Sequence, residues 1–531
     1  MLAVLLLSLA LFGQAPDAQG QGRRQGGQQT PAQQPAPITT QPPGMQPSPQ
    51  TGQRSAQERP SPLPEEPPVI THHSITVGGK ELRYTATVGM MPIKNRDGET
   101  EARIFFMAYT LDSAGDRQQR PLTFSFNGGP GSASVWLHMG AIGPRRVPMN
   151  PDGTMPAPPY RLIDNEQTWL DQSDLVFIDP VGTGYSRAVR PEVASRFFSL
   201  QGDIESVGDF IRMYLTRYER WTSPLFLAGE SYGTTRASAL SGYLIGRGIA
   251  FNGIVLISTI MNFETTDFAS GNDLPYVMYL PSYAATAWYH KKLPRDLQSK
   301  SVQQVVAEAE HWAANDYTLA LEKGDRLSAQ ERQEAVAKLA HYTGLDPQFV
   351  DNANLRVSLN FFRKELLRNE KRSIGRLDAR FKGYDSSYVT AGPDFDASEA
   401  AIRPPYTSTF NNYVRTELNF KTDLEYYILG GGIGPWNWGT NNGYVDTSVA
   451  LRDALARNPY LKIFVAMGYY DMATPYFAVQ YTMHHISLDP GLLKNFSTGY
   501  YEAGHMMYID EKQLSRLRAD VRKFIEDSQR R

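Results

Sequence analysis

The sequence predicts an α/β fold in which a mainly parallel sheet is interrupted by a largely helical insertion. Short apolar runs rich in Val, Ile, Leu and Phe recur along the chain, which is typical of strands that are buried on both faces. A helix-like segment separates two of these runs, as in a strand–helix–strand unit. Between residues 261 and 430 helical periodicity replaces the short runs, and the strand pattern returns afterwards.

Five runs are predicted to form the strands of the parallel sheet. The third run is followed by GTTRASALSGYLIGRG, a helix-compatible segment that glycine closes, and then by the fourth run. Parallel neighbours joined by a crossover helix are the expected result of this order. The five runs are Leu122–Phe126, Leu175–Ile178, Leu225–Ala228, Ile254–Ile257 and Ile463–Ala466.

The insertion, residues 261–430, carries two clear helix starts. Ser328 to Glu331 reads as a capping box, in which serine and glutamate bond each other's backbone N–H groups. Asp346 followed by Pro347 reads as an N-cap with proline at the first helical position. Because the strand pattern resumes near Lys462, the insertion divides the sheet-bearing core into residues 69–260 and 431–531.

The chain begins with a segment that resembles an export signal. An apolar run of 11 residues, 2–12, precedes Gly13-Gln14-Ala15, which places small residues at the two positions that a signal peptidase reads. The usual positive charges before the run are absent, and an uncleaved anchor is the alternative, although the run is short for a membrane span. We expect residues 1–15 to be a signal peptide and the protein to be exported to the periplasm or the extracellular space.

Residues 16–68 are predicted to form a disordered linker. Gln, Pro, Gly and Ser dominate them and large apolar residues are rare, so burial cannot repay the entropy of ordering. Folded sequence is predicted to begin near Val69, where the strand-like alternation of ITVGGKELRYTATVGMMPI contains a turn signal at Gly78-Gly79.

Composition excludes several classes of function. The 53 Lys and Arg residues are balanced by 55 Asp and Glu residues, a net charge of -2, so the chain has no basic footprint for nucleic acid. It has no cysteine, which excludes disulfides, thiolate zinc sites and a cysteine nucleophile. Beyond the N-terminal segment, no stretch is predicted to span a membrane.

Ser231 is the candidate nucleophile. Residues 229–233, GESYG, fit the pattern G-x-S-x-G, whose glycines permit the sharp strand-to-helix turn that lifts the serine oxygen clear of the backbone. The five letters alone are weak evidence. A predicted strand precedes them and a predicted helix follows, and this context favours a nucleophilic serine.

His505 is the candidate base. A serine hydroxyl attacks efficiently only when a base removes its proton, and in hydrolases with this turn the acid and the histidine follow the serine. His505 lies in YYEAGHMMYID, a loop position after the strand-like KNFSTGYY. Three other histidines fall in the insertion and two lie in a helical run, where packing or surface roles are expected. These five are His290, His311, His341, His484 and His485.

Asp471 is the candidate acid, because KIFVAMGYYDMATP places it just beyond the last predicted strand. In that position it would orient His505 and stabilise its imidazolium form. Asp510, five residues after His505, is the alternative. Its place before EKQLSRLRADVRKFI is better explained as the N-cap of the last helix.

A glycine-rich loop is the candidate oxyanion hole. The tetrahedral intermediate needs two N–H donors, one from the residue after the nucleophile and one from a loop after an earlier strand. FSFNGGPGSAS supplies such a loop directly after Leu122–Phe126. Taken alone, residues 127–131 would be an ordinary turn, but beside a nucleophile they predict an anion-stabilising site.

Four separated blocks resemble the serine carboxypeptidases, α/β-hydrolases that remove C-terminal residues from peptides. The blocks are NGGPGSAS from Asn127, VFIDPVGTGYS from Val176, GESYGTT from Gly229 and AGHM from Ala503, with GYYD from Gly468 as a looser fifth. They follow the family's order across most of the folded chain. The resemblance implies an α/β-hydrolase core with an inserted helical cap, and it implies no metal ion or organic cofactor.

The resemblance also implies a role for each matched residue. It assigns Ser231 as the nucleophile, Asp471 as the acid and His505 as the base. It places the two oxyanion-hole N–H groups at Gly129 and Tyr232. It assigns Asn127 and Glu230 to hold the terminal carboxylate of the substrate. Two carboxylates in contact cannot both stay ionised, so Glu230 beside a substrate carboxylate requires a shared proton and favours acidic conditions.

The sequence departs from the family at three positions. The family usually has tryptophan two residues before the asparagine and cysteine at the sixth motif position, where this chain has Ser125 and Ser132. It also usually has a glutamate fourteen residues beyond the asparagine, hydrogen-bonded to the one before the serine, where this chain has Ala141. The absence of cysteines points to a bacterial-type branch.

The expected function is that of an exported serine carboxypeptidase whose substrate is a peptide with a free C-terminus. Attack by Ser231 would give an acyl-enzyme, which water activated by His505 would hydrolyse. An esterase or acyltransferase with the same triad is the alternative, because fold and nucleophile do not fix the acyl substrate. A catalytically silent scaffold is a second alternative, but folding does not require an intact set of Ser231, Asp471 and His505.

Overall fold

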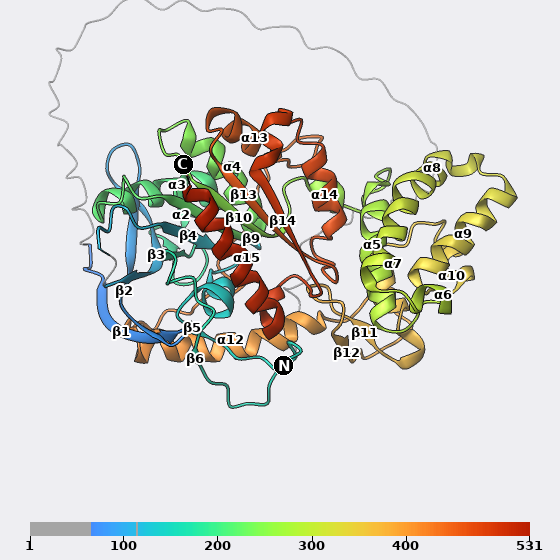
Figure 1. Cartoon of the computed structure of the whole chain (residues 1–531), viewed down its shortest axis with the longest axis horizontal. Coiled ribbons are helices and arrows are strands. Elements are labelled where there is room, and N and C mark those ends of the chain that lie inside the picture. Colours follow the sequence, from blue (N-terminus) through green and yellow to red (C-terminus); the bar gives the residue numbers. More distant parts are fainter. Residues whose placement is uncertain (1–64, 113–114, 531) are drawn as a thin grey trace, which may run out of the picture. The chain divides into compact units, whose positions relative to one another are not determined.

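The computed structural model describes residues 65–112 and 115–530, which are built around a ten-stranded mixed sheet (Figure 1). The strand order is β1-β2-β3-β7-β4-β9-β10-β13-β14, and β8 pairs with β3 outside this path. The predicted signal peptide and most of the predicted linker lie outside the described residues.

One side of the sheet is antiparallel. β1 (Val69–Val77) and β2 (Lys80–Lys94) form a hairpin, and β2 pairs with the long β3 (Thr100–Leu111). The hairpin turn has positive φ at Gly78 (57°) and Gly79 (79°), the geometry of a two-residue turn that favours glycine at both positions. The predicted turn is confirmed, and β1 begins at Val69.

The other side of the sheet is parallel and confirms the predicted α/β class. All neighbours from β7 to β14 in the strand order run parallel. The five predicted runs are all strands, and the strand-like segment before His505 supplies a sixth. The six are β7 (Asp174–Ile178), β4 (Leu122–Phe126), β9 (Leu225–Ser231), β10 (Gly253–Thr259), β13 (Lys462–Gly468) and β14 (Phe496–Tyr501).

Alternate residues of each central strand enter two different hydrophobic cores. In β9, Leu225 and Leu227 join one core while Phe226 and Ala228 join the other. β10 and β13 divide in the same way. Successive side chains of a strand point to opposite faces, so uninterrupted apolar runs are what a sheet covered on both faces requires.

Helices cover both faces of the parallel strands (Figure 1). On one face α4 (Tyr232–Ile245) packs against α3 (Leu200–Arg217) and α13 (Ser448–Arg457). On the other, α15 (Glu511–Gln529) packs against β10, β13 and β14 and shares a core with α12 (Ala397–Thr416).

Residues 261–430 form two groups of elements. Helices α5 (Leu274–Tyr289), α7 (Val302–Trp312) and α9 (Ala329–Thr343) pack together beside the sheet, whereas α12 runs along the core (Figure 1). The capping box of Ser328 with Glu331 and the N-cap of Asp346 are present as predicted.

The remaining elements are short and connect these layers. The helices are α1 (Val135–Leu137), α2 (Pro191–Phe197), α6 (Arg295–Gln298), α8 (Thr318–Lys323), α10 (Pro347–Asn352), α11 (Leu359–Glu365) and α14 (Tyr476–His484). The strands are β5 (Arg145–Arg146), β6 (Ile163–Asp164), β8 (Arg187–Ala188), β11 (Ser373–Ile374) and β12 (Lys382–Gly383). The tighter or wider helical turns are η1 (His138–Ile142), η2 (Phe263–Thr266), η3 (Ala313–Tyr317), η4 (Gly324–Arg326), η5 (Arg368–Glu370), η6 (Pro490–Asn495) and η7 (Met507–Ile509).

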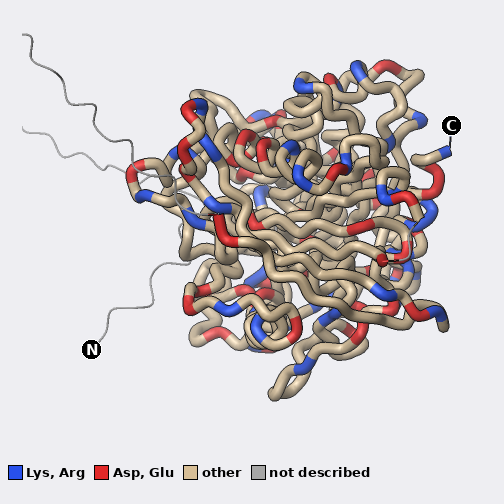
Figure 2. The backbone as a smooth tube through the Cα atoms, turned by 90° about the vertical axis from the view of Figure 1, so that its left-hand side faces the viewer, with Lys and Arg blue, Asp and Glu red and all other residues tan. Residues whose placement is uncertain are grey.

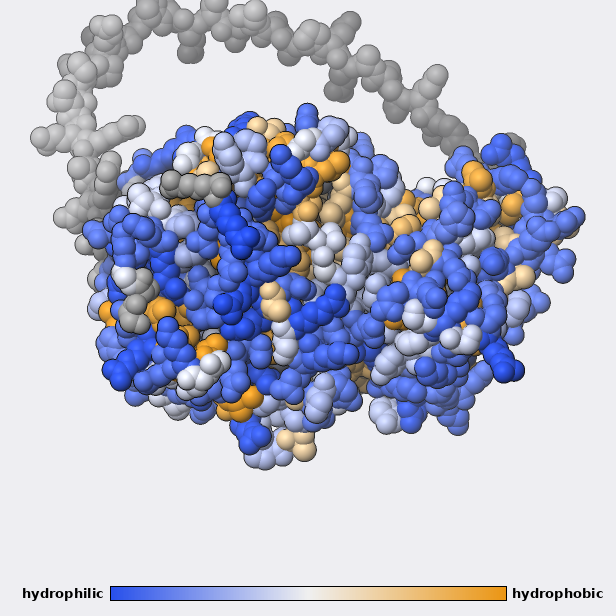
Figure 3. Space-filling model, in the orientation of Figure 1, coloured by the Kyte–Doolittle hydropathy of each residue, from blue (hydrophilic) through white to orange (hydrophobic). Residues whose placement is uncertain are grey.

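Two views of the molecule show how charged and hydrophobic residues are distributed over the faces in view. Figure 2 shows basic and acidic residues interspersed over the face in view. In Figure 3 hydrophobic residues appear as small areas among hydrophilic ones. Among the described residues, no helix is both long and apolar enough to cross a bilayer.

We expect Lys364→Ala to destabilise the protein by about 3–5 kcal/mol, because it leaves the buried Asp385 without its ion-pair partner. Both side chains are almost fully buried, and Ser373 also donates to Asp385 (Oγ to Oδ1, 3.0 Å). Lys300→Ala is the matched control, because its partner Glu308 is 42% exposed and such pairs contribute about 1 kcal/mol or less. Urea unfolding measures the free energy of unfolding of both variants. An equal loss of stability in the two variants would show that the buried Lys364–Asp385 pair contributes no more than the exposed one.

Candidate active site

Ser231 occupies a sharp turn between β9 and α4. Its backbone has φ 60° and ψ -133°, a conformation that residues other than glycine rarely adopt. The turn is closed by glycines on either side: a Cβ at Gly229 would collide with the carbonyl oxygen of Gly233, and one at Gly233 would lie 2.8 Å from the oxygen of Phe126. The half-buried serine therefore projects from a strained turn at the end of a strand, as the motif predicts.

Asp471 lies in the loop after β13 and is fully buried. One of its oxygens, Oδ1, accepts hydrogen bonds from the N–H groups of Ala473 (2.8 Å) and Thr474 (2.9 Å). The other, Oδ2, accepts one from the Thr474 hydroxyl (2.8 Å). These donors compensate the carboxylate for the loss of water and fix its orientation.

His505 lies in the loop after β14, and its Nδ1 is 2.8 Å from Oδ2 of Asp471. Its backbone is held on both sides, because its N–H donates to Leu377 (2.6 Å) and its carbonyl accepts from Ser258 (2.6 Å). Burial by itself would lower the pKa of His505. The charge of Asp471, the hydrogen bond to it and the charge of Glu230 outweigh burial and raise that pKa above its usual value.

A segment of the insertion ties the loops of Asp471 and His505 together. The carbonyl of Arg376 accepts from the N–H of Met472 (3.0 Å), and the N–H of Ala379 donates to Tyr470 (3.0 Å). In the same segment, the Leu377 carbonyl accepts from the N–H of His505, and the Asp378 carboxylate accepts from the N–H of Gly504 (3.1 Å). Residues 376–379 thus bridge two loops that are separate in sequence.

The loop after β4 lies against the first turn of α4. A Cβ at Gly128 would collide with the N atom of Tyr232 and lie 2.8 Å from that of Gly233, so only glycine fits. Gly129 follows with φ 103°, which also favours glycine. The structure therefore brings the two predicted oxyanion donors, at Gly129 and Tyr232, to neighbouring positions.

Asn127 and Glu230, the predicted carboxylate-binding pair, are in contact and buried. The Asn127 Nδ2 donates to Oε1 of Glu230 (2.9 Å), while its Oδ1 accepts from the N–H of Leu137 (3.0 Å). Burial raises the pKa of Glu230 to about 7, against the opposing influence of a charged His505. Glu230 therefore holds a proton up to near-neutral pH.

Among the described residues no hydrogen bond joins Ser231 to His505. Between the predicted site residues, the described part of the chain contains the hydrogen bonds of His505 with Asp471 and of Asn127 with Glu230. Hydrogen bonds between a nucleophile and its base are often looser before substrate binds.

The alternative residues have other roles. Asp510 caps α15 by accepting from the N–H of Gln513 (3.2 Å), as predicted. His290 bonds the carbonyl of Ala379 (2.8 Å), and His341 pairs with Asp296. His485 bonds the carbonyl of Tyr481 one helical turn earlier (2.7 Å). The described residues hold no group of three or more His, Cys, Asp or Glu side chains that could bind a metal ion.

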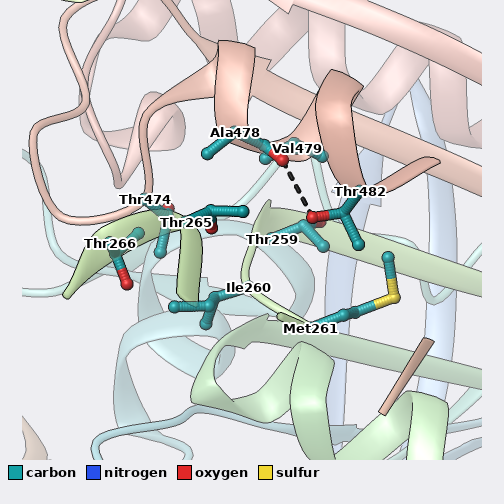
Figure 4. Close-up of a pocket in the computed structure, with 9 residues that line it drawn as sticks. All are labelled: Thr259, Ile260, Met261, Thr265, Thr266, Thr474, Ala478, Val479 and Thr482. Atoms are coloured by element: carbon teal, nitrogen blue, oxygen red, sulfur yellow. Dashed lines mark hydrogen bonds between the residues drawn. The ribbon is translucent and has the colours of Figure 1, made fainter. Parts of the chain in front are cut away.

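Behind Thr474 lies a small cavity lined by threonines and apolar side chains (Figure 4). Its volume of about 10 Å³ is at the lower limit for one water molecule, so it is too small for a substrate side chain. The hydroxyl of Thr259 in its wall is buried without a partner. The lining residues are Thr259, Ile260, Met261, Thr265, Thr266, Thr474, Ala478, Val479 and Thr482.

The structure adds supporting residues that the sequence analysis did not identify. Thr474 bonds Asp471, and its position three residues later in the same loop could have suggested this. Arg236 pairs with Asp203 inside the core and donates to the carbonyl of Asn127 (2.7 Å). The Tyr232 hydroxyl donates to the same Asp203 (3.0 Å), and no spacing rule would have linked these residues.

Comparison with known proteins identifies the family. The pattern that defines the serine carboxypeptidases, peptidase family S10, matches residues 85–515, which is most of the chain. The chain belongs to the serine carboxypeptidase family. Both the predicted family and the predicted α/β-hydrolase fold are thereby confirmed.

Two curated relatives illustrate the similarity. The pheromone-processing carboxypeptidase KEX1 of Saccharomyces cerevisiae is 32% identical over 155 residues, 27% of this chain and 20% of that protein. Serine carboxypeptidase-like 45 of Arabidopsis thaliana is 24% identical over 270 residues, 45% of this chain and 55% of that protein. The chain thus spans between a fifth and about half of the length of these relatives.

Among solved structures, the prohormone-processing carboxypeptidase Kex1 of S. cerevisiae aligns with a TM-score of 0.49. The alignment has 18% sequence identity and covers 83% of this chain and 91% of that one.

We expect Gly128→Ala to lower kcat by about 100-fold or more, because the added methyl group would push the loop off the N–H of Tyr232. The measurement is turnover of an activated ester, with thermal unfolding to verify that the variant is folded. Gly443→Ala is the matched control, since a Cβ there has no neighbour within 4 Å. An unchanged kcat would show that the loop does not stabilise the transition state.

Proposed function

We propose that the protein is a serine carboxypeptidase that releases C-terminal residues from peptides through an acyl-enzyme on Ser231. The observation that carries the proposal is the hydrogen bond between His505 and Asp471 at the carboxyl ends of parallel strands, the same edge of the sheet where β9 ends at Ser231. Membership of the family supports the same reaction.

In the proposed mechanism Ser231 attacks the carbonyl of the last peptide bond. Asp471 holds Nδ1 of His505, which leaves Nε2 to take the serine proton and then give it to the leaving amine. The N–H groups of Gly129 and Tyr232 stabilise the negative oxygen of the intermediate. Water, activated by His505, then hydrolyses the ester and restores Ser231.

Asn127 and Glu230 are proposed to recognise the free C-terminus of the peptide. A protonated Glu230 can share its proton with the substrate carboxylate, whereas an ionised one repels it. Since burial raises the pKa of Glu230 to about 7, this recognition is present at acidic pH and is lost as the pH rises through about 7. Substrates without a C-terminal carboxylate gain nothing from it.

His505 imposes the opposite dependence. The raised pKa of His505 means that the base is protonated, and catalysis suppressed, over more of the acidic range for every substrate. The ratio of activities on two substrates that differ only at the C-terminus removes this shared effect and isolates Glu230.

We also propose that residues 261–430 act as a cap and that the protein is exported. The contacts of residues 376–379 with the loops of Asp471 and His505 support a role for the insertion at the site. The apolar run and the small residues near Ala15 support export to the periplasm or the extracellular space.

The function is tested with a blocked dipeptide, its C-terminal amide and a simple ester, across about pH 4 to 8. We expect the free acid to be cut in preference to the amide at low pH, with the preference falling as Glu230 ionises. Ser231→Ala should abolish all three activities. Turnover of the ester alone would favour an esterase, and failure of a fluorophosphonate to label Ser231 would favour a silent scaffold.

Export is tested by expressing the whole chain with a C-terminal tag in a Gram-negative host and fractionating the cells. We expect tagged protein outside the cytoplasm with an N-terminus at Pro16, because cleavage after Ala15 follows the small-residue rule. Tagged protein confined to the cytoplasm, with its first residues intact, would overturn the proposal.

A further inference from the structure

Three buried polar atoms near the proposed carboxylate site lack a hydrogen bond of normal geometry. They are Oε2 of Glu230 and the hydroxyl oxygens of Tyr406 and Tyr508. The three residues are 3%, 0% and 2% exposed, so bulk water does not supply the missing partners. An unsatisfied buried polar atom is costly, and three in one place call for an explanation.

The two tyrosines meet at Gly140. A Cβ at this glycine would lie 2.6 Å from the hydroxyl oxygen of Tyr406 and would collide with the ring of Tyr508. Tyr406 comes from α12, whereas Tyr508 lies in η7, three residues after His505. The missing side chain at Gly140 makes room for both rings.

Both tyrosines interact electrostatically with Glu230, Tyr508 more directly than Tyr406. Tyr508 is close enough to Glu230 and Asn127 to influence Glu230 as a hydrogen-bond donor would, which opposes the rise in its pKa. A charged Glu230 in turn raises the pKa of Tyr406, together with burial. Tyr508 is therefore the hydroxyl nearest in effect to Glu230, although no well-aligned bond joins them, and Tyr406 lies within range of the charge of Glu230.

This cluster contacts the segment in which the family resemblance implies a second acid. The glutamate expected fourteen residues beyond Asn127 is replaced by Ala141, which is buried and whose carbonyl accepts from Asn165 (2.8 Å). Its neighbour Gly140 is the residue that contacts the two tyrosines. Two phenols thus meet at Gly140, and one of them, Tyr508, interacts with Glu230 in a chain that lacks the second carboxyl group.

We propose that Tyr508, assisted by Tyr406, takes the place of the second acid by positioning Glu230 and leaving it as the single proton-exchanging group of the carboxylate site. The inference rests on the proposed function for its consequence in catalysis. Tyr406 and Tyr508 are positioning residues in this scheme, because they act through Glu230 rather than on the reacting atoms.

A site with two carboxyl groups titrates differently from a site with one carboxyl group beside two phenols. Two carboxyl groups in contact share protons and titrate in two coupled steps. Phenols stay protonated and neutral: burial, followed by the charge of Glu230, raises the pKa of Tyr508 well above its usual value. Glu230 is then the one carboxyl group of this cluster that exchanges a proton, and a hydrogen-bond donor beside it stabilises the ionised form.

The other groups that face Glu230 belong to the proposed triad. A charged His505 lowers the pKa of Glu230, and Asp471 raises it. Arg146 acts on Tyr406 and lowers its pKa. These groups remain in a Tyr508→Phe variant, so a change in the titration of Glu230 can be assigned to the lost hydroxyl.

The direct test follows the protonated carboxyl band of Glu230 by infrared difference spectroscopy as a function of pH in the full chain. Glu230→Gln identifies the band by removing it. In the unsubstituted protein we expect a single-proton titration. In Tyr508→Phe the midpoint should move up by about one pH unit, because a donor to the ionised form has been removed. Tyr406→Phe should move it in the same direction, by less.

Tyr413→Phe is the matched control. Tyr413 lies on the same helix as Tyr406 and is equally buried, but its hydroxyl bonds Tyr109 (3.1 Å) and not Glu230. The midpoint should not move in this variant. An unchanged or lowered midpoint in both Tyr508→Phe and Tyr406→Phe, or an equal shift in Tyr413→Phe, would overturn the inference.

A kinetic readout separates this inference from the proposed function. The ratio of kcat/KM for the free acid to that for the amide should fall with pH at the infrared midpoint, and the fall should shift upward in Tyr508→Phe. An infrared shift without any preference for the free acid would reject the proposed function and keep the inference. A preference for the free acid with no infrared shift would keep the proposed function and reject the inference.

Discussion

The turn at Ser231 is the constraint on which the rest of the site depends. A residue with a side chain is held at φ 60°, and this costs energy that the surrounding packing must supply. Gly229 and Gly233 allow the strand and helix to approach, and Gly128 lets a second loop touch the same helix end. The strained turn at Ser231 and the glycines around it thus hold β4, β9 and the start of α4 close together.

Around this turn, Asp471 and His505 are each held by several hydrogen bonds besides the one between them. Asp471 accepts from two backbone N–H groups and a threonine before it meets His505. His505 is anchored through its backbone to β10 and to the insertion. Such preorganisation in a buried setting makes each charge interaction stronger than it would be in water. The insertion takes part in this anchoring, because residues 376–379 form hydrogen bonds with both loops.

Glu230 links the geometry of the site to its dependence on pH. The carboxyl group is buried beside a potential cation, His505, and beside neutral donors, and the balance keeps it protonated to about pH 7. In a site with two acids the same position would share protons between like groups. In the proposed arrangement phenols stand in place of the second acid, so fewer protons are exchanged by the carboxylate site. The tyrosines fill the space against Gly140.

Much of the fold and part of the site followed from the sequence alone. Uninterrupted apolar runs identified the buried strands, because a strand covered on both faces has no polar side. Glycine spacing identified the turn at Ser231, and chain order with strand ends pointed to Asp471 and His505, because parallel strands present their carboxyl ends at one edge.

Only the tertiary structure decided which distant residues support that site. Thr474, Ser258 and residues 376–379 act through contacts that leave no periodic trace in the sequence. Likewise, nothing in local spacing joins Tyr406 of α12 to Tyr508 after β14. The sequence determines which segments form strands, helices and turns, because those choices depend on neighbouring residues. The packing of those segments determines the environment of Glu230, because burial and charge depend on residues hundreds of positions away.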